Sequence, residues 1–337
     1  MESRPAAPPP AALPRLGVGL AYQPALRRFI EERRDTFDYL EVVPDILWTD
    51  RGRGAAPRYL DDEEGIAFLA RHAGGRPIVP HSIGLSIGTA HRFNRDHLGQ
   101  IERWLARFPA PWFSDHLAYN LAEHGADEIN AGVTIPLPRD RATLDDLAPR
   151  VAEVRERLGV PFLLENNVYF FDFADAEMDD AAFLNALAAE TGCGLLLDLH
   201  NVHCNAVNQG VDARRLLDEL DLGRVIEIHV AGGMERGGTW LDAHSGPLPP
   251  EVWELLEHAL PRCPALGGVT FELFGSWYPA IGGERLADEL AGLRESWHRH
   301  QPPPVAPGEW EAPVAARAAG GVAVATAAAT PVEAAAR

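Results

Sequence analysis

Eight short apolar runs recur along the chain, and most of them end in ionisable or amide side chains. The run Gly194–Leu197, for example, leads directly into Asp198, His200, Asn201 and His203. A continuous apolar run of this length is typical of a parallel strand that is buried on both faces. Burying the polar groups at its end without partners would cost several kcal/mol. We therefore expect a metal, a substrate or neighbouring side chains to satisfy them.

The other seven predicted strands repeat this arrangement. They cover Leu16–Tyr22, Tyr39–Pro44, Pro77–Gly84, Trp112–Tyr119, Pro161–Asn167, Val225–Gly232 and Gly268–Phe274. Segments with the apolar spacing of a helix separate the strands, such as Asn94–Phe108 and Arg285–Trp297. This alternation predicts an α/β fold in which eight parallel strands close into a single (β/α)8, or TIM, barrel. The polar strand ends would then meet on one face of the barrel, where such enzymes keep their chemistry.

The two ends of the chain lack this pattern. Residues 1–15 are rich in proline and alanine, and residues 301–337 pass from a proline-rich start into a low-complexity stretch. We therefore expect one domain over residues 16–300, with a disordered lead before it and a disordered tail after it. On this interpretation, a truncation after His300 would leave the iron content and the melting temperature nearly unchanged. The alternative is that the tail forms a short helix that docks a partner.

Composition narrows the possible functions. The formal net charge of the 337 residues is −19, which opposes binding to the phosphate backbone of nucleic acids. The chain contains no lysine, so Schiff-base chemistry and the P-loop lysine are excluded. The three cysteines form no CxxC pair. No apolar run reaches transmembrane length and no signal peptide stands out, so we expect a cytoplasmic protein without a membrane or nucleic-acid partner.

Nine side chains near the predicted strand ends form the candidate site. They are His81, His116, Glu165, Asp198, Asn201, His229, Asp242, His244 and Glu272. A set of imidazoles and carboxylates without a thiolate suits iron, manganese or zinc. Because one metal takes about four to six ligands, nine candidates indicate two or three ions, with Glu165 or Glu272 able to bridge. Each side chain alone could be an ordinary buried polar group, and their convergence on one face is what favours a metal centre.

Several ordered motifs also resemble a known family. The motifs are HSIGLSIG from His81, SDHLAY around His116, LLENN around Glu165, LLLDLHNV around Asp198 and Asn201, EIHVAG around His229, and DAHSGP from Asp242 to Pro247. They resemble the DUF692 family, also called the multinuclear non-heme iron-dependent oxidases, which includes the methanobactin-biosynthesis oxidase. The resemblance covers about residues 16–300. The chain departs from the common pattern at His200 and His203, where members commonly carry asparagine and tyrosine.

The resemblance implies a TIM barrel in which the nine side chains hold two or three irons, in mixed ferrous and ferric states. His81, Glu165, His229 and Glu272 are the implied catalytic residues. The implied reaction uses dioxygen to modify a side chain of a ribosomally synthesised precursor peptide, most often cysteine and in some members aspartate. The resemblance further implies a small partner protein that recognises the leader of that peptide.

Three alternatives remain open at this point: a metal-dependent phosphoesterase like endonuclease IV, a sugar isomerase of the xylose-isomerase type, and a non-catalytic metal-binding module. The net charge of −19 weighs against the first alternative. The absence of lysine weighs against many versions of the second. Anaerobic reconstitution with iron, followed by a measurement of oxygen consumption with peptide, would separate an oxidase from all three.

Overall fold

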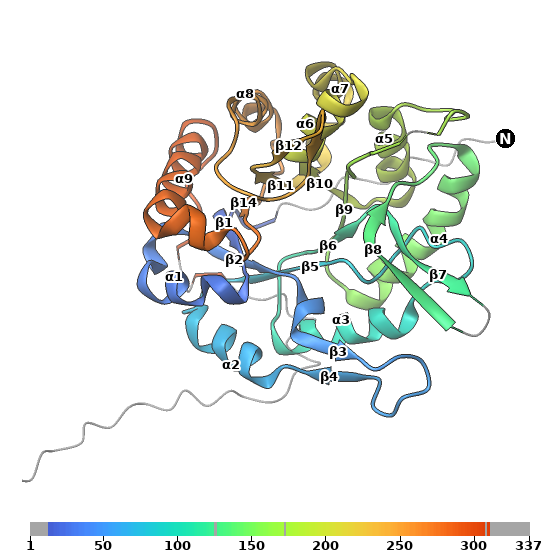
Figure 1. The fold of residues 1–337 in the computed structure, drawn as a ribbon, viewed down its shortest axis with the longest axis horizontal. Helices are drawn as coiled ribbons and strands as arrows, with labels where there is room; N and C mark the ends of the chain where they lie inside the picture. Colours follow the sequence, from blue (N-terminus) through green and yellow to red (C-terminus); the bar gives the residue numbers. More distant parts are fainter. Residues whose placement is uncertain (1–12, 125–126, 172, 307–308, 311–337) are drawn as a thin grey trace, which may run out of the picture.

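Eight parallel strands form a closed barrel in the computed structural model of the chain, with helices around it (Figure 1). The structure describes residues 13–124, 127–171, 173–306 and 309–310. The barrel strands are β1 (Gly17–Ala21), β2 (Tyr39–Val42), β5 (Ile78–Ser82), β6 (Phe113–His116), β9 (Phe162–Glu165), β10 (Gly194–Asp198), β11 (Val225–Ala231) and β14 (Gly268–Glu272). Pairing of β14 with β1 closes the ring. The predicted TIM-barrel fold is confirmed.

Nine α-helices are present in the described residues. They are α1 (Arg27–Glu32), α2 (Glu63–His72), α3 (Arg95–Arg107), α4 (Arg141–Leu158), α5 (Asp180–Thr191), α6 (Leu199–Gln209), α7 (Ala213–Glu219), α8 (Pro250–Ala259) and α9 (Tyr278–His300). Helix α3 illustrates why these segments fold as they do. The Asn94 side chain caps its first turn, and Leu98, Ile101 and Leu105 bury one face against the core. Among the described helices, none combines the length and the apolar character that a membrane span requires.

Helix α6 was not predicted from the sequence. It begins directly after β10, and Asp198 is its N-cap, with Oδ1 accepting a hydrogen bond from the backbone N–H of Asn201 at 2.7 Å. The first turns of this helix are buried on all sides, so its sequence lacks the one-sided apolar pattern that marks a surface helix. Consequently, Asn201 reaches the candidate site from a helix and not from a strand end.

Three two-stranded ribbons lie outside the barrel strands. They are β3 with β4 (Trp48–Asp50 and Tyr59–Asp61), β7 with β8 (Tyr119–His124 and Asp127–Ile135), and β12 with β13 (Met234–Arg236 and Thr239–Leu241). The β7–β8 ribbon projects away from the barrel strands (Figure 1). The β12–β13 ribbon contacts α6 through β13. Through that contact it reaches the helix that carries Asn201.

The barrel interior is built in layers. Its N-terminal layer is apolar and consists of Leu16, Tyr39, Val79, Trp112, Leu163, Leu196 and Ile226. Two positions further along their strands, Glu41 follows Tyr39, His81 follows Val79 and Glu165 follows Leu163. Side chains two residues apart on a strand point to the same side, so the apolar layer directly supports a polar layer above it. Gly19 is required beside this layer, because a Cβ atom there would lie 2.4 Å from the Tyr39 ring.

Both ends of the described chain cover the N-terminal opening of the barrel. Leu13, Val305 and Trp310 pack against the apolar layer. The backbone N–H of Val305 donates to the carbonyl oxygen of Arg15 at 2.8 Å, and the Trp297 indole N–H donates to the carbonyl of Pro302 at 3.0 Å. The packed chain therefore extends beyond both boundaries expected from composition. Most of the expected lead and tail, residues 1–12 and 311–337, lies outside the described residues.

Truncation after His300 is accordingly expected to lower the melting temperature by roughly 5 °C. The change would uncover the apolar layer and cost about 2 kcal/mol of unfolding free energy. A chain that ends at Trp310 keeps these contacts and should melt like the full-length protein. Thermal unfolding of the three chains, followed by circular dichroism, checks this expectation. Equal melting temperatures for all three would mean that the C-terminal contacts contribute little.

Candidate metal centre

The nine candidate side chains converge at the C-terminal end of the barrel. Six come from strands, one from α6, and two from the loop that follows β13. Glu165 is central, because its Oε2 lies 3.3 Å from Nε2 of His81 and 3.3 Å from Nε2 of His116. Its other oxygen, Oε1, lies 3.9 Å from Nδ1 of His229 and 3.5 Å from Nδ2 of Asn201. One carboxylate thus connects four of the other candidates.

Hydrogen bonds on the far side of two rings orient them toward Glu165. Nδ1 of His116 lies 3.2 Å from the carbonyl oxygen of Ser82, which can only accept a hydrogen bond, so Nδ1 carries the proton. This leaves the lone pair of His116 on Nε2, the nitrogen that faces Glu165. Nδ1 of His81 lies 3.0 Å from Oγ of Ser114. Both rings therefore present Nε2 to the same carboxylate.

His229 shows the arrangement that proteins use for metal-binding histidines. Its Nε2 lies 2.7 Å from Oε2 of the buried Glu41, and its Nδ1 lies 3.3 Å from Oε2 of Glu272. A carboxylate on the outer nitrogen fixes the ring and leaves the inner nitrogen to a metal. Glu41 is not one of the nine candidate ligands, and the sequence predicts a supporting or ion-paired role for it. Its position in the middle of a predicted strand was the available signal.

A neighbouring carboxylate, Glu227, is satisfied within the protein. Its two oxygens accept hydrogen bonds from the hydroxyl of Tyr39 at 3.1 Å, the indole of Trp112 at 2.6 Å and the hydroxyl of Thr270 at 2.8 Å. Three donors on one buried carboxylate fix it firmly. Glu227 therefore joins the polar layer to the apolar layer of the barrel.

The second half of the site lies between the loop after β13 and the end of β14. Nε2 of His244 lies 2.8 Å from Oδ1 of Asp242 and 3.7 Å from Oε2 of Glu272. His244 adopts the left-handed backbone conformation, with φ at +41°. Its carbonyl accepts a hydrogen bond from Phe274 N–H at 3.0 Å, which ties the loop to the end of β14. A non-glycine residue held in this conformation is typical of a functional site.

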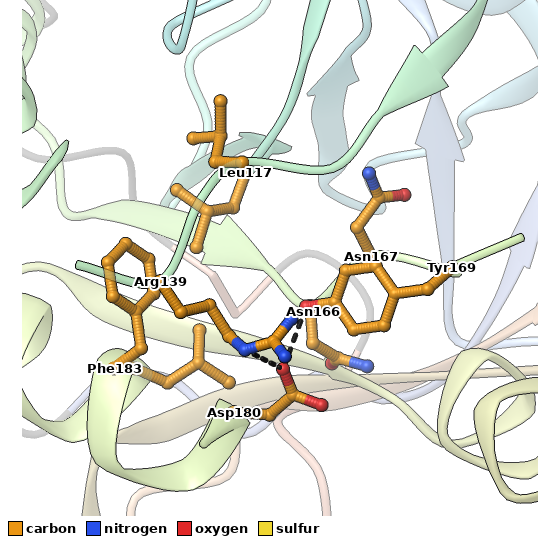
Figure 2. Close-up of a pocket in the computed structure, with 9 residues that line it drawn as sticks. Leu117, Arg139, Asn166, Asn167, Tyr169, Asp180 and Phe183 are labelled. Carbon is orange, nitrogen blue, oxygen red and sulfur yellow. Dashed lines mark hydrogen bonds and ion pairs between the residues drawn. The ribbon is translucent and has the colours of Figure 1, made fainter. Parts of the chain in front are cut away.

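Asparagines hold the ends of β9 and β10 together. The side chain of Asn166 donates to the carbonyl of Asp198 at 2.9 Å and accepts from the N–H of Asp198 at 2.8 Å. Figure 2 shows Asn166 among the residues that line a small pocket, together with Asp180. Asp180 pairs with Arg139 at 3.2 Å and accepts a hydrogen bond from Tyr169 at 3.0 Å. These contacts keep the loop after Glu165 in place, and sequence reasoning did not assign them this role.

The residues present fit a metal centre. Glu165 Oε2, Asn201 Oδ1 and His229 Nδ1 are buried atoms that lack a hydrogen-bond partner. All three can offer a lone pair to a metal, and leaving them unsatisfied would be costly. Three overlapping groups, each within 4.8 Å, have suitable ligand atoms: His81 with His116 and Glu165, Glu165 with Asp198 and His229, and Asp198 with His244 and Glu272. Consecutive groups share a carboxylate, Glu165 or Asp198.

Without metal, several of these side chains hold protons unusually tightly. Burial raises the pKa of Glu165 to about 8, and burial together with the Glu165 charge raises the pKa of Asp198 to about 8. Burial lowers the pKa of His244, but Asp242 outweighs this effect and raises it to about 10. For His229, the charges of Glu41 and Glu272 likewise outweigh burial and raise the pKa. The metal-free native state therefore binds more protons than the unfolded chain near neutral pH.

The metal-free protein is therefore expected to lose stability between about pH 6.5 and pH 8.5. Over this interval, the carboxyl and imidazole groups whose pKa values are raised keep protons that the unfolded chain has released. The free energy of unfolding therefore falls as pH rises. Burial lowers the pKa values of His81 and His116. These two groups make stability rise with pH, but only below about pH 6.5, where the histidines of the unfolded chain are protonated. Urea unfolding of chelator-treated protein across this interval tests the expectation. The metal-loaded protein is the control and should change less, because metal replaces the protons.

Comparisons with known proteins identify the family. Residues 17–290 match the sequence profile of the family described as "RiPP precursor modification enzyme MbnB/TglH/ChrH". A RiPP is a ribosomally synthesised and post-translationally modified peptide. The chain belongs to the MbnB/TglH/ChrH family. The resemblance to DUF692 is thereby confirmed, and the family comprises enzymes that modify precursor peptides.

Curated relatives of this MbnB/TglH/ChrH protein carry the designation UPF0276. The relative from Chromobacterium violaceum is 34% identical over 223 residues, which cover 66% of this chain and 78% of the relative. The relative from Acaryochloris marina is 37% identical over 220 residues, 65% of this chain and 77% of the relative. The relative from Streptomyces avermitilis is 30% identical over 288 residues, 83% of this chain and 56% of the relative.

Solved structures with a similar fold include sugar epimerases. A D-allulose 3-epimerase from a Methylomonas species, in complex with D-allulose, has a TM-score of 0.54 at 14% identity, covering 87% of this chain and all 100% of its own. A D-psicose 3-epimerase from Clostridium cellulolyticum H10, with D-tagatose, has a TM-score of 0.52 at 14% identity, covering 85% and 99%. At this level of identity the likeness concerns the barrel fold alone.

Proposed function

We propose that the protein is a multinuclear iron-dependent oxidase that uses dioxygen to modify a side chain of a ribosomally synthesised precursor peptide. Cysteine is the residue that we expect to be modified, with aspartate as the second choice. The observation that carries this proposal is the run of three overlapping ligand groups, in which Glu165 and Asp198 are each shared by two groups. Membership of a family of peptide-modifying enzymes supports the choice of substrate.

The ligand groups would hold two or three irons. His81, His116 and Glu165 would bind one ion. Asp198 and His229, again with Glu165, would bind a second. Carboxylate and imidazole ligands of this kind are common in non-heme iron sites. A third position would use His244 and Glu272 with Asp198. Asp242 lies beside His244 of this position, and the Asn201 side chain lies beside Glu165. Glu165 belongs to the first and second positions, and Glu272 of the third position lies 3.3 Å from His229 of the second, so either carboxylate would be able to bridge two ions, as would the shared Asp198.

The chain supplies positioning and shielding around this centre. Bound iron would provide the redox chemistry with dioxygen that no side chain can perform. Glu41 holds the His229 ring through Nε2, and the Ser82 carbonyl holds the His116 ring through Nδ1. His81, Glu165, His229 and Glu272, the four residues that we propose as catalytic, are all buried, which limits the access of water to the reacting groups.

The mouth of the barrel would receive the precursor peptide. Ile83 follows the strand of His81 and is 38% exposed, while Phe274 follows the strand of Glu272 and is 43% exposed. Apolar side chains exposed this close to a polar centre suit contact with a peptide. A small protein that recognises the peptide leader is the partner that we propose, with the reaction taking place in the cytoplasm.

The proposal is tested by iron content and by peptide conversion. Protein purified without oxygen is expected to contain more than one iron per chain, and two to three after reconstitution with ferrous iron. Addition of oxygen and of a candidate precursor, encoded beside the gene, should give oxygen consumption and a mass change in the peptide. Zinc-loaded protein is the control and should leave the peptide unchanged. Zinc as the stably bound metal, with no gain in activity on iron reconstitution, would contradict the proposal.

A further inference from the structure

His200 lies in the first turn of α6 with both ring nitrogens engaged. Its Nδ1 is 3.0 Å from Oδ1 of Asp242, and its Nε2 accepts a hydrogen bond from the indole N–H of Trp240 at 3.1 Å. The His200 side chain is completely buried. The ring therefore bridges a carboxylate of the candidate metal centre and a tryptophan of the β12–β13 ribbon.

The tryptophan determines which nitrogen of His200 carries the proton. An indole N–H can only donate, so Nε2 of His200 must be the acceptor and cannot itself be protonated in this arrangement. A neutral imidazole then carries its proton on Nδ1 and donates it to Oδ1 of Asp242. The Nδ1 proton of His200 is donated to Asp242 and the Nε2 lone pair accepts from Trp240. Neither nitrogen is therefore left to bind a metal.

The position of Trp240 is itself fixed by the helix that carries His200. The backbone N–H of Trp240 donates to Oδ1 of Asn208 at 2.8 Å, and Nδ2 of Asn208 donates to the Trp240 carbonyl at 2.8 Å. The close approach of the Trp240 indole to the His200 ring also depends on the lack of a side chain at Gly233. A Cβ atom at that position would lie 2.3 Å from the indole nitrogen of Trp240 and 2.4 Å from Nε2 of His200.

We infer that His200 is a positioning residue for Asp242 and not a ligand of the metal centre. Trp240 fixes the proton of His200 on Nδ1, and His200 in turn fixes the Asp242 carboxylate beside His244. The inference rests on the proposed metal centre and deepens it. It divides a cluster of three potential ligands, His200, Asp242 and His244, into two that face a metal and one that holds a ligand in place.

The test measures how many metal ions each variant binds and how fast it loses them. Each variant is loaded with Co²⁺, which reports binding through its visible absorption, and is then challenged with excess chelator. His200→Gln keeps both an acceptor for Trp240 and a donor for Asp242, so it should bind as many ions as the parent. His200→Ala and Trp240→Phe should also keep that number but lose one ion roughly tenfold faster, as is typical for partners of metal ligands.

Two further variants and one control make the interpretation specific. Gly233→Ala should reproduce the faster loss without a change in either partner, because it separates Trp240 from His200. Asp242→Ala should bind one ion fewer. His258, which pairs with Asp218 at 2.8 Å and contacts none of the candidate ligands in the described residues, gives the matched control, His258→Gln, which should behave like the parent.

Two outcomes would overturn the inference. Loss of one ion in both His200→Gln and His200→Ala would make His200 a ligand, and unchanged loss rates in His200→Ala and Trp240→Phe would remove its positioning role. Thermal unfolding of the metal-free variants identifies any change that arises from folding. The test needs neither iron nor peptide, so a negative result for peptide oxidation would contradict the proposed function and leave this inference standing.

Discussion

His229→Ala is expected to abolish peptide modification and to remove at least one metal ion per chain. The inner nitrogen of His229 faces both Glu165 and Glu272, at 3.9 and 3.3 Å, so its loss affects a ligand group at the middle of the run. Loss of the ring also leaves Glu41 buried without its partner. We expect the unfolding free energy to fall by about 3 kcal/mol, because an unpaired buried carboxyl is costly.

Glu41→Gln provides the matched control for this prediction. The amide oxygen can still accept from Nε2 of His229, so the ring should keep its orientation and the ion should stay bound. We would measure metal content, urea unfolding and the peptide mass shift on both variants. The comparison separates the loss of His229 as a metal ligand from the loss of the Glu41 carboxylate that holds its ring. Full peptide conversion by His229→Ala with an unchanged ion count would exclude His229 as a ligand.

Glu165→Gln is expected to have the largest effect on metal content, with the loss of up to two ions. Glu165 belongs to two of the three overlapping groups, and no other candidate lies within 3.3 Å of both His81 and His116 in the described part of the chain. A neutral amide binds a metal far more weakly than a carboxylate. Activity should therefore fall to background, as measured by oxygen consumption with peptide.

The same substitution should leave the metal-free fold intact. The pKa of Glu165 is about 8 in the metal-free protein, so the side chain is largely neutral there at pH 7 and glutamine is close to it in shape and charge. At pH 8.5 the variant should be at least as stable as the parent, because it has no buried carboxyl to ionise. A variant that unfolds when metal-free, or one that keeps its full ion count, would contradict the central role of Glu165.

The barrel could be predicted, and so could the meeting of most candidate side chains at one end of it, because both depend on local patterns. A buried parallel strand is apolar throughout, so the ends of such runs mark the barrel mouth and the residues placed there, as at Glu165 and Asp198. Helix α6 gave no such pattern, since contacts with other segments bury its first turns on all sides. Closer attention to Asp198 as an N-cap, with Asn201 three residues later, could have revealed it.

A supporting role could be predicted for Glu41 and Glu227 as acidic residues inside apolar strands, but their partners could not, because these lie far away in the sequence. Glu41 pairs with His229 across 188 positions, and His200 meets Trp240 across 40. A lone glutamate in a predicted strand, or a histidine beside a predicted ligand, is equally compatible with several roles. The same holds for Val305 and Trp310, whose packing depends on an opening that exists only once the barrel has closed.

Because the N-terminal end of the barrel is covered, metal loading and peptide docking would have to occur in a fixed order. Leu13, Val305 and Trp310 lie against the apolar layer at that end, and the buried Glu227 with its three donors lies between this layer and the ligands. Metal ions and small molecules therefore reach and leave the centre through the C-terminal end of the barrel, which is also where a peptide would dock. A docked peptide would slow the exchange of metal and of small molecules with solvent. Loading of the centre would then have to precede docking, and the bound peptide would protect the metal from a chelator.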